Sequence, residues 1–286
     1  MVFPDTDSKM VDIRQSVHFA NYLKRIGWNV ERIGEINYFI RRFPILGSIL
    51  KVQRPEEIRI DIIRKLARKY RVFQIIIEPK TEFDAKYLTS IGFKLSKNPY
   101  IPSKTLQIDL TQGQKEIFRH FKKDARSGVK RGGTLQIRSC STPDEIKKWR
   151  EAWKNSVEFK RYVPGEQQLL NLRKSFPGGY SLFLASHNMS GRIIGGVLFT
   201  RSLHDFGYYW YGFTNDEGRT TLSQYTLLYQ GILWAKKQGC KVFDFEGVYD
   251  PRFPDKSWLG FSHFKRSFGG YEVEYPGCFV KTRLPV

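Results

Sequence analysis

The second half of the chain alternates helix-like and strand-like patterns in an order that few folds accommodate. Apolar residues three to four positions apart mark one face of a helix, on which lie Ile146, Trp149, Trp153 and Val157. Three β-rich runs, a second helical stretch and another strand follow, over residues 181–185, 193–200, 206–211, 222–237 and 241–245. A helix, an antiparallel meander, a helix and a further strand together predict an α/β architecture.

The first half of the chain follows the same plan more loosely. Helices are expected over residues 17–25 and 55–69, a buried strand over 72–77 and an alternating strand over 105–110. A length of 286 residues allows one large domain or two smaller ones. Two similar α/β domains are the economical interpretation.

The charge of the chain favours a polyanionic partner. Lys and Arg number 48 against 28 Asp and Glu, for a formal charge of +20, and nucleic acid, nucleotide pyrophosphates or an anionic membrane surface would each suit it. Residues 41–71 hold ten Lys/Arg and three acidic residues, and residues 119–138 hold seven and one. In the first segment we expect the solvated face of a helix. In the second, cations beside a glycine-rich turn over 128–133 are candidate phosphate ligands, namely Lys123, Arg126 and Lys130.

Several classes of function lack their motifs. The sequence contains no Walker-type phosphate loop, no GxGxxG and no GxSxG, and its five histidines never stand four residues apart, so we expect no metal site. Cys140, Cys240 and Cys278 are too far apart for a CxxC pair and are expected as buried thiols. The apolar runs are too short to span a membrane, and the charged first twenty residues do not read as a signal segment. We therefore expect a cytoplasmic protein.

The most distinctive block lies near the C-terminus. It comprises Phe-Asp-Phe-Glu-Gly-Val at 243–248, Gly-Phe-Ser-His-Phe-Lys-Arg-Ser-Phe-Gly-Gly at 260–270 and Glu-Tyr-Pro-Gly at 274–277. These motifs, in this order and spacing, resemble the FemABX family of aminoacyl-tRNA-dependent peptidoglycan aminoacyltransferases. Arg54-Pro55 and Trp234-Ala235 agree as well, so the resemblance spans nearly the whole chain.

The resemblance implies a fold, a reaction and partners. The fold would be two tandem acetyltransferase-like (GNAT-type) domains, 1–138 and 139–269, with residues from about 270 to 286 returning to complete the first. The reaction would move an amino acid from aminoacyl-tRNA to an amine of a peptidoglycan precursor stem peptide. Aminoacyl-tRNA would be a co-substrate and no other cofactor would be needed. The precursor would be lipid-linked or UDP-linked, the protein a monomer, and its charge allows peripheral contact with the inner membrane face.

The resemblance also implies roles for individual residues. Lys265 would supply a cation to the oxyanion that develops on the aminoacyl carbonyl, and Phe264 would shape the wall beside it. The candidate substrate-binding residues are Tyr211, Arg161, Glu78 and Arg54. Lys123, Arg126 and Lys130 become candidates for contacts with tRNA phosphates. Asp244 is expected as a hydrogen-bonding residue at the end of a strand, rather than as an acid catalyst.

Two other interpretations stay open. A CoA-dependent N-acyltransferase of the same fold would present a glycine-rich turn of the Q/R-x-x-G-x-G/A kind at a helix start, which residues 215–220 lack. A non-catalytic RNA-binding protein would explain the charge and leave the C-terminal block unexplained. Such a protein would bind RNA in a salt-sensitive way that survives the substitution Lys265→Ala.

Overall fold

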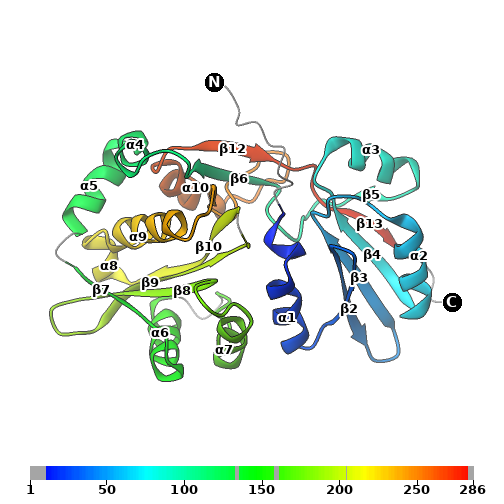
Figure 1. Ribbon diagram of the computed structural model, residues 1–286, viewed down its shortest axis with the longest axis horizontal. Helices are drawn as coiled ribbons and strands as arrows, with labels where there is room; N and C mark the ends of the chain where they lie inside the picture. Colours follow the sequence, from blue (N-terminus) through cyan, green and yellow to red (C-terminus); the bar gives the residue numbers. More distant parts are fainter. Residues whose placement is uncertain (1–10, 133–134, 158–160, 204, 283–286) are drawn as a thin grey trace. The chain divides into compact units, whose positions relative to one another are not determined.

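The computed structural model describes residues 11–132, 135–157, 161–203 and 205–282, and the chain divides into two compact units. Unit 1 comprises Met1–Ser103 and Glu274–Val286, and unit 2 comprises Lys104–Val273. In each unit helices pack on a mixed sheet (Figure 1). The expected α/β class is confirmed.

Unit 1 is built on a six-stranded sheet of order β1-β2-β3-β4-β13-β5. Its strands are β1 (Asn29–Ile33), β2 (Ile36–Phe43), β3 (Gly47–Gln53), β4 (Val72–Glu78), β5 (Lys94–Leu95) and β13 (Phe279–Thr282). Its helices are η1 (Ile13–Gln15), α1 (Val17–Arg25), α2 (Ile60–Lys69) and α3 (Glu82–Ser90). Strand β13 pairs antiparallel with both β4 and β5. The expected return of the last strand to the first domain is thus confirmed.

Helix α2 forms because its apolar and basic residues separate onto two faces. Ile63 and Leu66 are buried in the core of unit 1, while Lys65 and Arg68 are exposed. The expected solvated basic face is confirmed. The helix begins at Ile60 and not at residue 55, because the chain leaves β3 through Arg54 at a positive φ of 46° and turns before the helix starts.

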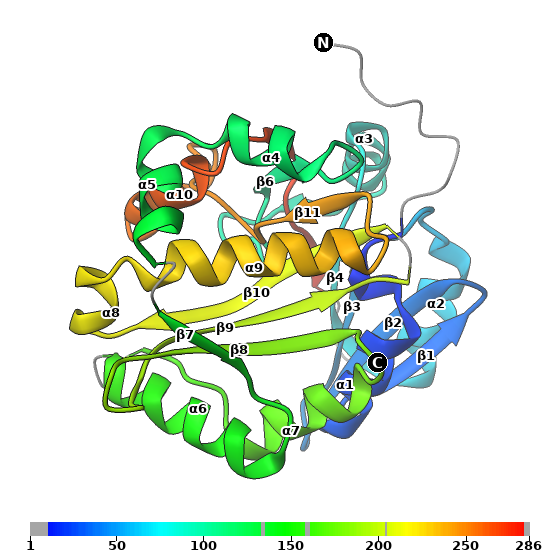
Figure 2. The same cartoon turned by 60° about the vertical axis from the view of Figure 1, so that its left-hand side comes forward.

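Unit 2 is built on a seven-stranded sheet of order β12-β6-β11-β10-β9-β8-β7. Its strands are β6 (Lys104–Asp109), β7 (Gln136–Ser139), β8 (Ser181–His187), β9 (Ile193–Arg201), β10 (Phe206–Thr214), β11 (Val242–Asp244) and β12 (Tyr271–Glu274). Its helices are α4 (Gln114–His120), α5 (Lys123–Arg131), α6 (Pro143–Ser156), α7 (Glu166–Ser175), α8 (Asp216–Thr220), α9 (Ser223–Lys237) and α10 (Trp258–Arg266). Helix α9 covers one face of the sheet, and α6 and α7 lie on the opposite face (Figure 2).

The boundary between the units differs from the expected residue 138. Residues 104–138 belong to unit 2, because β6 pairs antiparallel with β11. Thr105 and Gln107 on β6 also donate hydrogen bonds to the buried Asp244 carboxylate, at 2.6 and 2.8 Å. The partner strand lies more than 130 residues further along the chain, so local sequence patterns do not reveal this pairing.

Gly128 also differs from its expected place in a turn. It lies inside α5, where a Cβ atom would come within 2.5 Å of Cγ of Tyr225 on α9. The glycine therefore serves close packing of two helices. Gly132 stands at the end of α5, as its C-cap, and Gly133 lies outside the described residues.

The remaining general expectations concern cysteines, metals and membranes. All three cysteines are buried, as expected. Within the described part of the chain no group of three or more His, Cys, Asp or Glu side chains is arranged to hold a metal ion. Among the same residues no helix combines the length and apolar composition of a membrane span.

Candidate functional site

A cavity of about 720 Å³ lies in unit 2 along the second half of β10. Strand β10 pairs with β11 over Phe206–Tyr208 and then continues to Thr214 paired with β9 on its other side. The wall beyond that point comes from β10, the end of α6, the start of α9 and α10. It is largely aromatic, with Trp153, Tyr162, Tyr209, Tyr225, Phe261 and Phe264. Arg161 and Arg219 also line it, so the cavity suits a ligand with a planar apolar part and an anionic part.

Lys265 lies next to this cavity, packed against one of its lining residues. The side chain is on α10 and only 7 % exposed. Its Nζ donates a hydrogen bond of 2.7 Å to the Gly247 carbonyl oxygen and lies 5.6 and 5.5 Å from the ring centroids of Tyr209 and Trp258. Tyr209 lines the cavity and contacts the ammonium group, and Phe264 on α10 lines it as well.

The charge of Lys265 is weakly compensated. Burial lowers the pKa of Lys265 from 10.5 to about 8, and the negative charges of Glu246 and Asp244 only partly oppose this. Among the described residues no carboxylate forms an ion pair with its Nζ. An ammonium group has three N–H donors, and Gly247 accepts one of them. At neutral pH the side chain is therefore a buried cation that can stabilise an anion.

The Gly247 carbonyl that holds Lys265 is itself fixed by hydrogen bonds. Asp244, at the end of β11, accepts from the Glu246 backbone N–H at 2.7 Å, and the Gly247 N–H donates to Thr105 Oγ1 at 3.1 Å. Positive φ values of 54° at Glu246 and 109° at Gly247 turn the chain there. Asp244 thus has the hydrogen-bonding role expected at the end of a strand.

Two of the other expected site residues reach the same region. Arg161 lines the cavity, with its guanidinium carbon 5.6 Å from the Phe261 ring centroid. Tyr211 packs on Trp153 with ring centroids 5.2 Å apart, and Trp153 lines the cavity. Phe264 and Arg161 thus line the cavity, and Lys265 and Tyr211 each pack against a residue that lines it. Their contacts with substrate stay predictions.

Sequence reasoning missed Gln224 and Tyr225, at the start of α9. Both line the cavity, and Gln224 donates a hydrogen bond to the Phe213 carbonyl oxygen. The buried Gln224 Oε1 has no hydrogen-bond partner among the described residues. The N-cap residue before the helix, Leu222, has a positive φ of 57° and makes no side-chain cap. No motif marks these residues, because their place in the cavity depends on where α9 meets β10.

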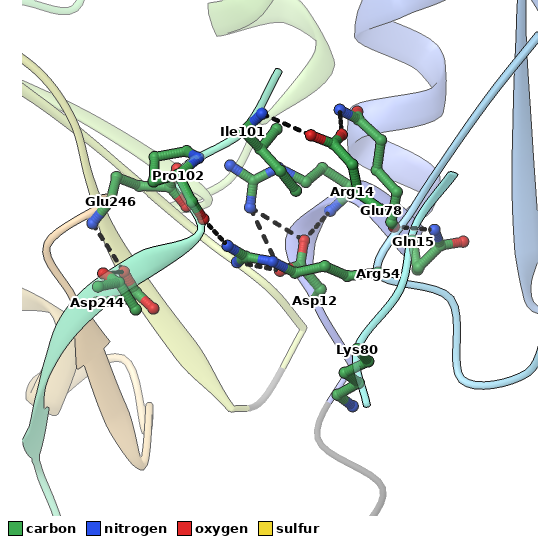
Figure 3. A network of polar contacts seen from close by, with 12 residues as sticks. Asp12, Arg14, Gln15, Arg54, Glu78, Lys80, Ile101, Pro102, Asp244 and Glu246 are labelled. Carbon is green, nitrogen blue, oxygen red and sulfur yellow. Dashed lines mark hydrogen bonds and ion pairs between the residues drawn. The ribbon is translucent and has the colours of Figure 1, made fainter. Parts of the chain in front are cut away.

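Arg54 belongs to a buried ionic network of unit 1 (Figure 3). Its Nη1 lies 3.0 Å from Asp12 Oδ2, its Nη2 donates to the Pro102 carbonyl oxygen at 2.7 Å, and its guanidinium stacks 3.6 Å from the Tyr275 ring centroid. Arg14 Nη1 lies 3.2 Å from Asp12 Oδ1. Burial alone would raise the pKa of Asp12, but the charges of Arg14 and Arg54 outweigh it and lower that pKa. These contacts give Arg54 a structural role.

Glu78 is equally enclosed in unit 1. Its Oε1 accepts hydrogen bonds from the backbone N–H groups of Tyr100 and Ile101, at 2.9 and 2.7 Å, and its Oε2 accepts one from Gln53 at 2.7 Å. Burial raises the pKa of Glu78, although these hydrogen bonds oppose the shift. The carboxylate therefore anchors the 100–101 segment. For Glu78 and Arg54, binding of substrate stays a prediction.

The three candidate tRNA ligands lie on α5. Lys123 and Lys130 are exposed, whereas Arg126 is half-buried and donates to the Arg119 carbonyl oxygen at 3.1 Å. Arg126 thereby caps the end of α4. Because Gly128 packs against Tyr225, α5 is fixed directly behind the cavity wall.

Comparison with known proteins identifies the fold. No protein-family model matches the chain, and no curated protein matches its sequence. Among solved structures it is similar to FemX, with a TM-score of 0.81 and 17 % identity over 97 % of this chain and 94 % of FemX. It is also similar to the C-terminal domain of a putative lysylphosphatidylglycerol synthetase from Agrobacterium fabrum, with a TM-score of 0.63 and 13 % identity over 95 % and 89 % of the two chains.

A tandem GNAT protein from the clavulanic acid biosynthesis pathway aligns as well, with a TM-score of 0.52 and 13 % identity over 86 % and 82 % of the two chains. The chain therefore has the fold of FemX, two tandem GNAT-like units with the last strand returned to the first. This is an acyltransferase-type fold, as expected from the resemblance to FemABX proteins.

Proposed function

We propose that this protein is an aminoacyltransferase that moves an amino acid from aminoacyl-tRNA to an amine of a peptidoglycan precursor stem peptide. The observation that carries the proposal is Lys265, a buried cation without an ion pair among the described residues, packed on a ring that lines an aromatic cavity. Strongly perturbed cations beside a cavity are typical of catalytic sites. The FemX fold supports the same assignment.

The proposed reaction needs a cation beside the carbonyl oxygen of the aminoacyl ester. The neutral acceptor amine attacks the ester carbonyl carbon of the aminoacyl group, and negative charge develops on the carbonyl oxygen. The bond from that carbon to the ribose oxygen then breaks, an amide forms, and the proton lost by the amine passes to the ribose oxygen. The Lys265 ammonium would stabilise the oxyanion, since a fixed N–H donor in a site of low dielectric acts strongly there. Its charge would also keep a nearby amine neutral.

The cavity would take the aminoacylated end of the tRNA. Aromatic side chains such as Tyr162 and Phe261 offer faces on which a base can stack, and Arg161 offers a partner for phosphate. Lys123, Arg126 and Lys130 on α5 would contact phosphates further along the tRNA. No cofactor besides the co-substrate is required for this chemistry.

A CoA-dependent acyltransferase is the alternative on the same fold, and a tandem GNAT protein is among the similar structures. The segment before α9 argues against it. That segment is helix α8, whose first turn carries the carboxylates of Asp216 and Glu217. These carboxylates pair with Arg219 and Arg192, and residues 215–220 lack the glycine-rich turn whose backbone N–H groups would hold a pyrophosphate.

The test is transfer of a radiolabelled amino acid from a panel of aminoacyl-tRNAs to nucleotide-linked and lipid-linked muramyl pentapeptides. We expect a labelled amide product with at least one donor and acceptor pair, and no acetyl transfer from acetyl-CoA to the same acceptors. Phosphatidylglycerol is a further acceptor arm, because the name of one similar protein points to lysylphosphatidylglycerol. A product with phosphatidylglycerol alone would overturn the peptidoglycan acceptor and keep the aminoacyl transfer.

Lys265→Ala should lower transfer by about 10²–10³-fold while aminoacyl-tRNA still binds. The matched control is Lys256→Ala, which removes an exposed lysine just before α10 and should transfer like the wild type. Salt-sensitive RNA binding without any transfer, identical in the wild type and Lys265→Ala, would identify an RNA-binding protein and contradict the proposal.

A further inference from the structure

The turn between β2 and β3 in unit 1 exposes apolar side chains. Ile45 is 100 % exposed, Leu46 63 % and Phe43 39 %, with the exposed Pro44 between them. The base of the turn is held in place, since the Phe43 ring packs on Phe73 with centroids 6.2 Å apart. We call residues 43–46 the apolar tip. Three large apolar side chains and a proline thus project from a fixed hairpin into solvent.

The backbone at Ile45 shows that folding does not explain this residue. Its φ is +70°, a left-handed conformation that a β-branched side chain adopts only under strain. Glycine or asparagine would relieve that strain. Ile45 gains no stability from burial, because its side chain is fully exposed. An apolar residue that is strained and solvated points to an interaction outside the folded chain.

Basic residues are concentrated at the same end of unit 1 as the apolar tip. The pairing of Asn29 with Ile40 brings the end of α1 to this edge of the sheet, and the Ser48 N–H donates to the Arg71 carbonyl oxygen at 3.0 Å. The ends of α1 and α2 therefore lie at the same end of unit 1 as the hairpin (Figure 1). The basic collar consists of Lys24, Arg25, Arg41, Arg42, Arg68, Lys69 and Arg71.

Little negative charge offsets the basic collar. Residues 24–25, 41–48 and 68–71 contain no Asp or Glu. Glu31 on β1 pairs with Lys69 at 2.6 Å. Arg42 lies 5.3 Å from the Tyr70 ring centroid, and both Arg42 and Arg68 are exposed. The surface therefore combines the protruding apolar tip with the basic collar.

We propose that the apolar tip and the basic collar form a docking surface for an anionic lipid bilayer. The side chains of Phe43, Ile45 and Leu46 enter the interfacial region, and the collar binds the headgroup phosphates, a combination that holds peripheral proteins on membranes. The most exposed side chains of the tip, Ile45 and Leu46, are aliphatic and offer no stacking face to a nucleic acid base, while the Phe43 ring already packs on Phe73, which disfavours RNA as the occupant. The inference does not depend on the transfer reaction.

The test is co-sedimentation of the full chain with vesicles of phosphatidylcholine containing about 30 mol % phosphatidylglycerol, compared with pure phosphatidylcholine. We expect wild-type protein to bind the anionic vesicles and to be released by salt. The double variant Ile45→Gly/Leu46→Ser should bind at least tenfold more weakly. Its fold should be intact, because glycine accepts the positive φ and both side chains are exposed.

Two matched controls separate binding through this surface from nonspecific hydrophobic or electrostatic binding to vesicles. Phe83→Ser/Met189→Ser removes two exposed apolar side chains elsewhere and should bind like the wild type. Arg42→Gln/Arg68→Gln should weaken binding about tenfold and flatten its salt dependence, whereas Arg173→Gln/Lys174→Gln at the end of α7 should do neither.

Two outcomes would overturn the proposal. One is wild-type binding to vesicles by the apolar-tip variant. The other is a wild-type dimer that this variant dissociates in light scattering, without vesicle binding by either protein, because the tip would then be an interface between two copies. Neither outcome bears on transfer to a nucleotide-linked acceptor, which the apolar-tip variant should retain.

Discussion

Two buried cations, one in each unit, are held in opposite ways. Arg54 in unit 1 is 3 % exposed and meets the Asp12 carboxylate, a backbone carbonyl and the Tyr275 ring. Lys265 in unit 2 is 7 % exposed and meets one backbone carbonyl and two aromatic rings. The first has a carboxylate to balance its charge, and the second has none among the residues that the structure describes.

This difference separates a structural cation from a functional one. A buried charge is tolerated when a partner and hydrogen bonds satisfy it, and it destabilises the fold when they do not. Arg54 has a carboxylate partner at Nη1 and a carbonyl partner at Nη2, so its network explains its presence. Lys265 lowers stability as a cation, which its depressed pKa of about 8 reflects. Its presence is explained by the reaction that we propose.

The largest effect on stability is expected for Arg54→Met. The variant leaves Asp12 buried with Arg14 as its remaining cationic partner, and breaking a buried pair costs about 3–5 kcal/mol. Urea unfolding should show this loss, and kcat of the folded fraction should stay near the wild-type value. A large rise in KM for the acceptor at unchanged stability would reverse the comparison and make Arg54 a substrate ligand.

Lys265→Met should show the opposite profile. Loss of one oxyanion donor lowers kcat by about 10²–10³, while the free energy of unfolding should equal or exceed that of the wild type, because an unpaired buried charge is removed. Transfer assays and urea unfolding of the same preparation measure both. A strongly destabilised variant with normal kcat would identify Lys265 as a structural cation like Arg54.

The pH dependence sharpens the same contrast. The cationic form of Lys265 is lost as pH rises through about 8, so kcat should fall about tenfold per pH unit above that value. Lys265→Arg keeps its charge and should lack this alkaline decline in whatever activity it retains. Because the unfolded chain binds the proton more tightly, the wild type should also gain stability over Lys265→Met between about pH 8 and 10.5. A kcat that is flat to pH 9.5 would contradict a catalytic cation.

The sequence predicted local helices and the cavity motif, but not the contacts between distant segments. Amphipathic spacing was sufficient for α1 and for the basic face of α2, and the Phe264-Lys265 motif pointed to the cavity wall. The pairing of β6 with β11 and the packing of Gly128 on Tyr225 are contacts between distant segments, so no local pattern carries them. The family resemblance made Arg54 and Glu78 candidate substrate ligands, which stays a prediction; their burial and hydrogen bonds depend on the fold and could not be read from the sequence.

The exposed cations of α5, Lys123 and Lys130, should have the smallest effect, because they are not buried and form no ion pair with the residues that the structure describes. Lys123→Gln/Lys130→Gln should raise KM for aminoacyl-tRNA a few-fold and reduce the slope of log affinity against log salt by about 1–2. Lys147→Gln/Lys154→Gln is the matched control, since these exposed lysines have the same seven-residue spacing on α6. Filter binding of aminoacyl-tRNA at several salt concentrations gives both slopes. Equal slopes for the two variants would show that α5 only contributes to net charge, and tRNA phosphates would then have to be bound by the cations that line the cavity.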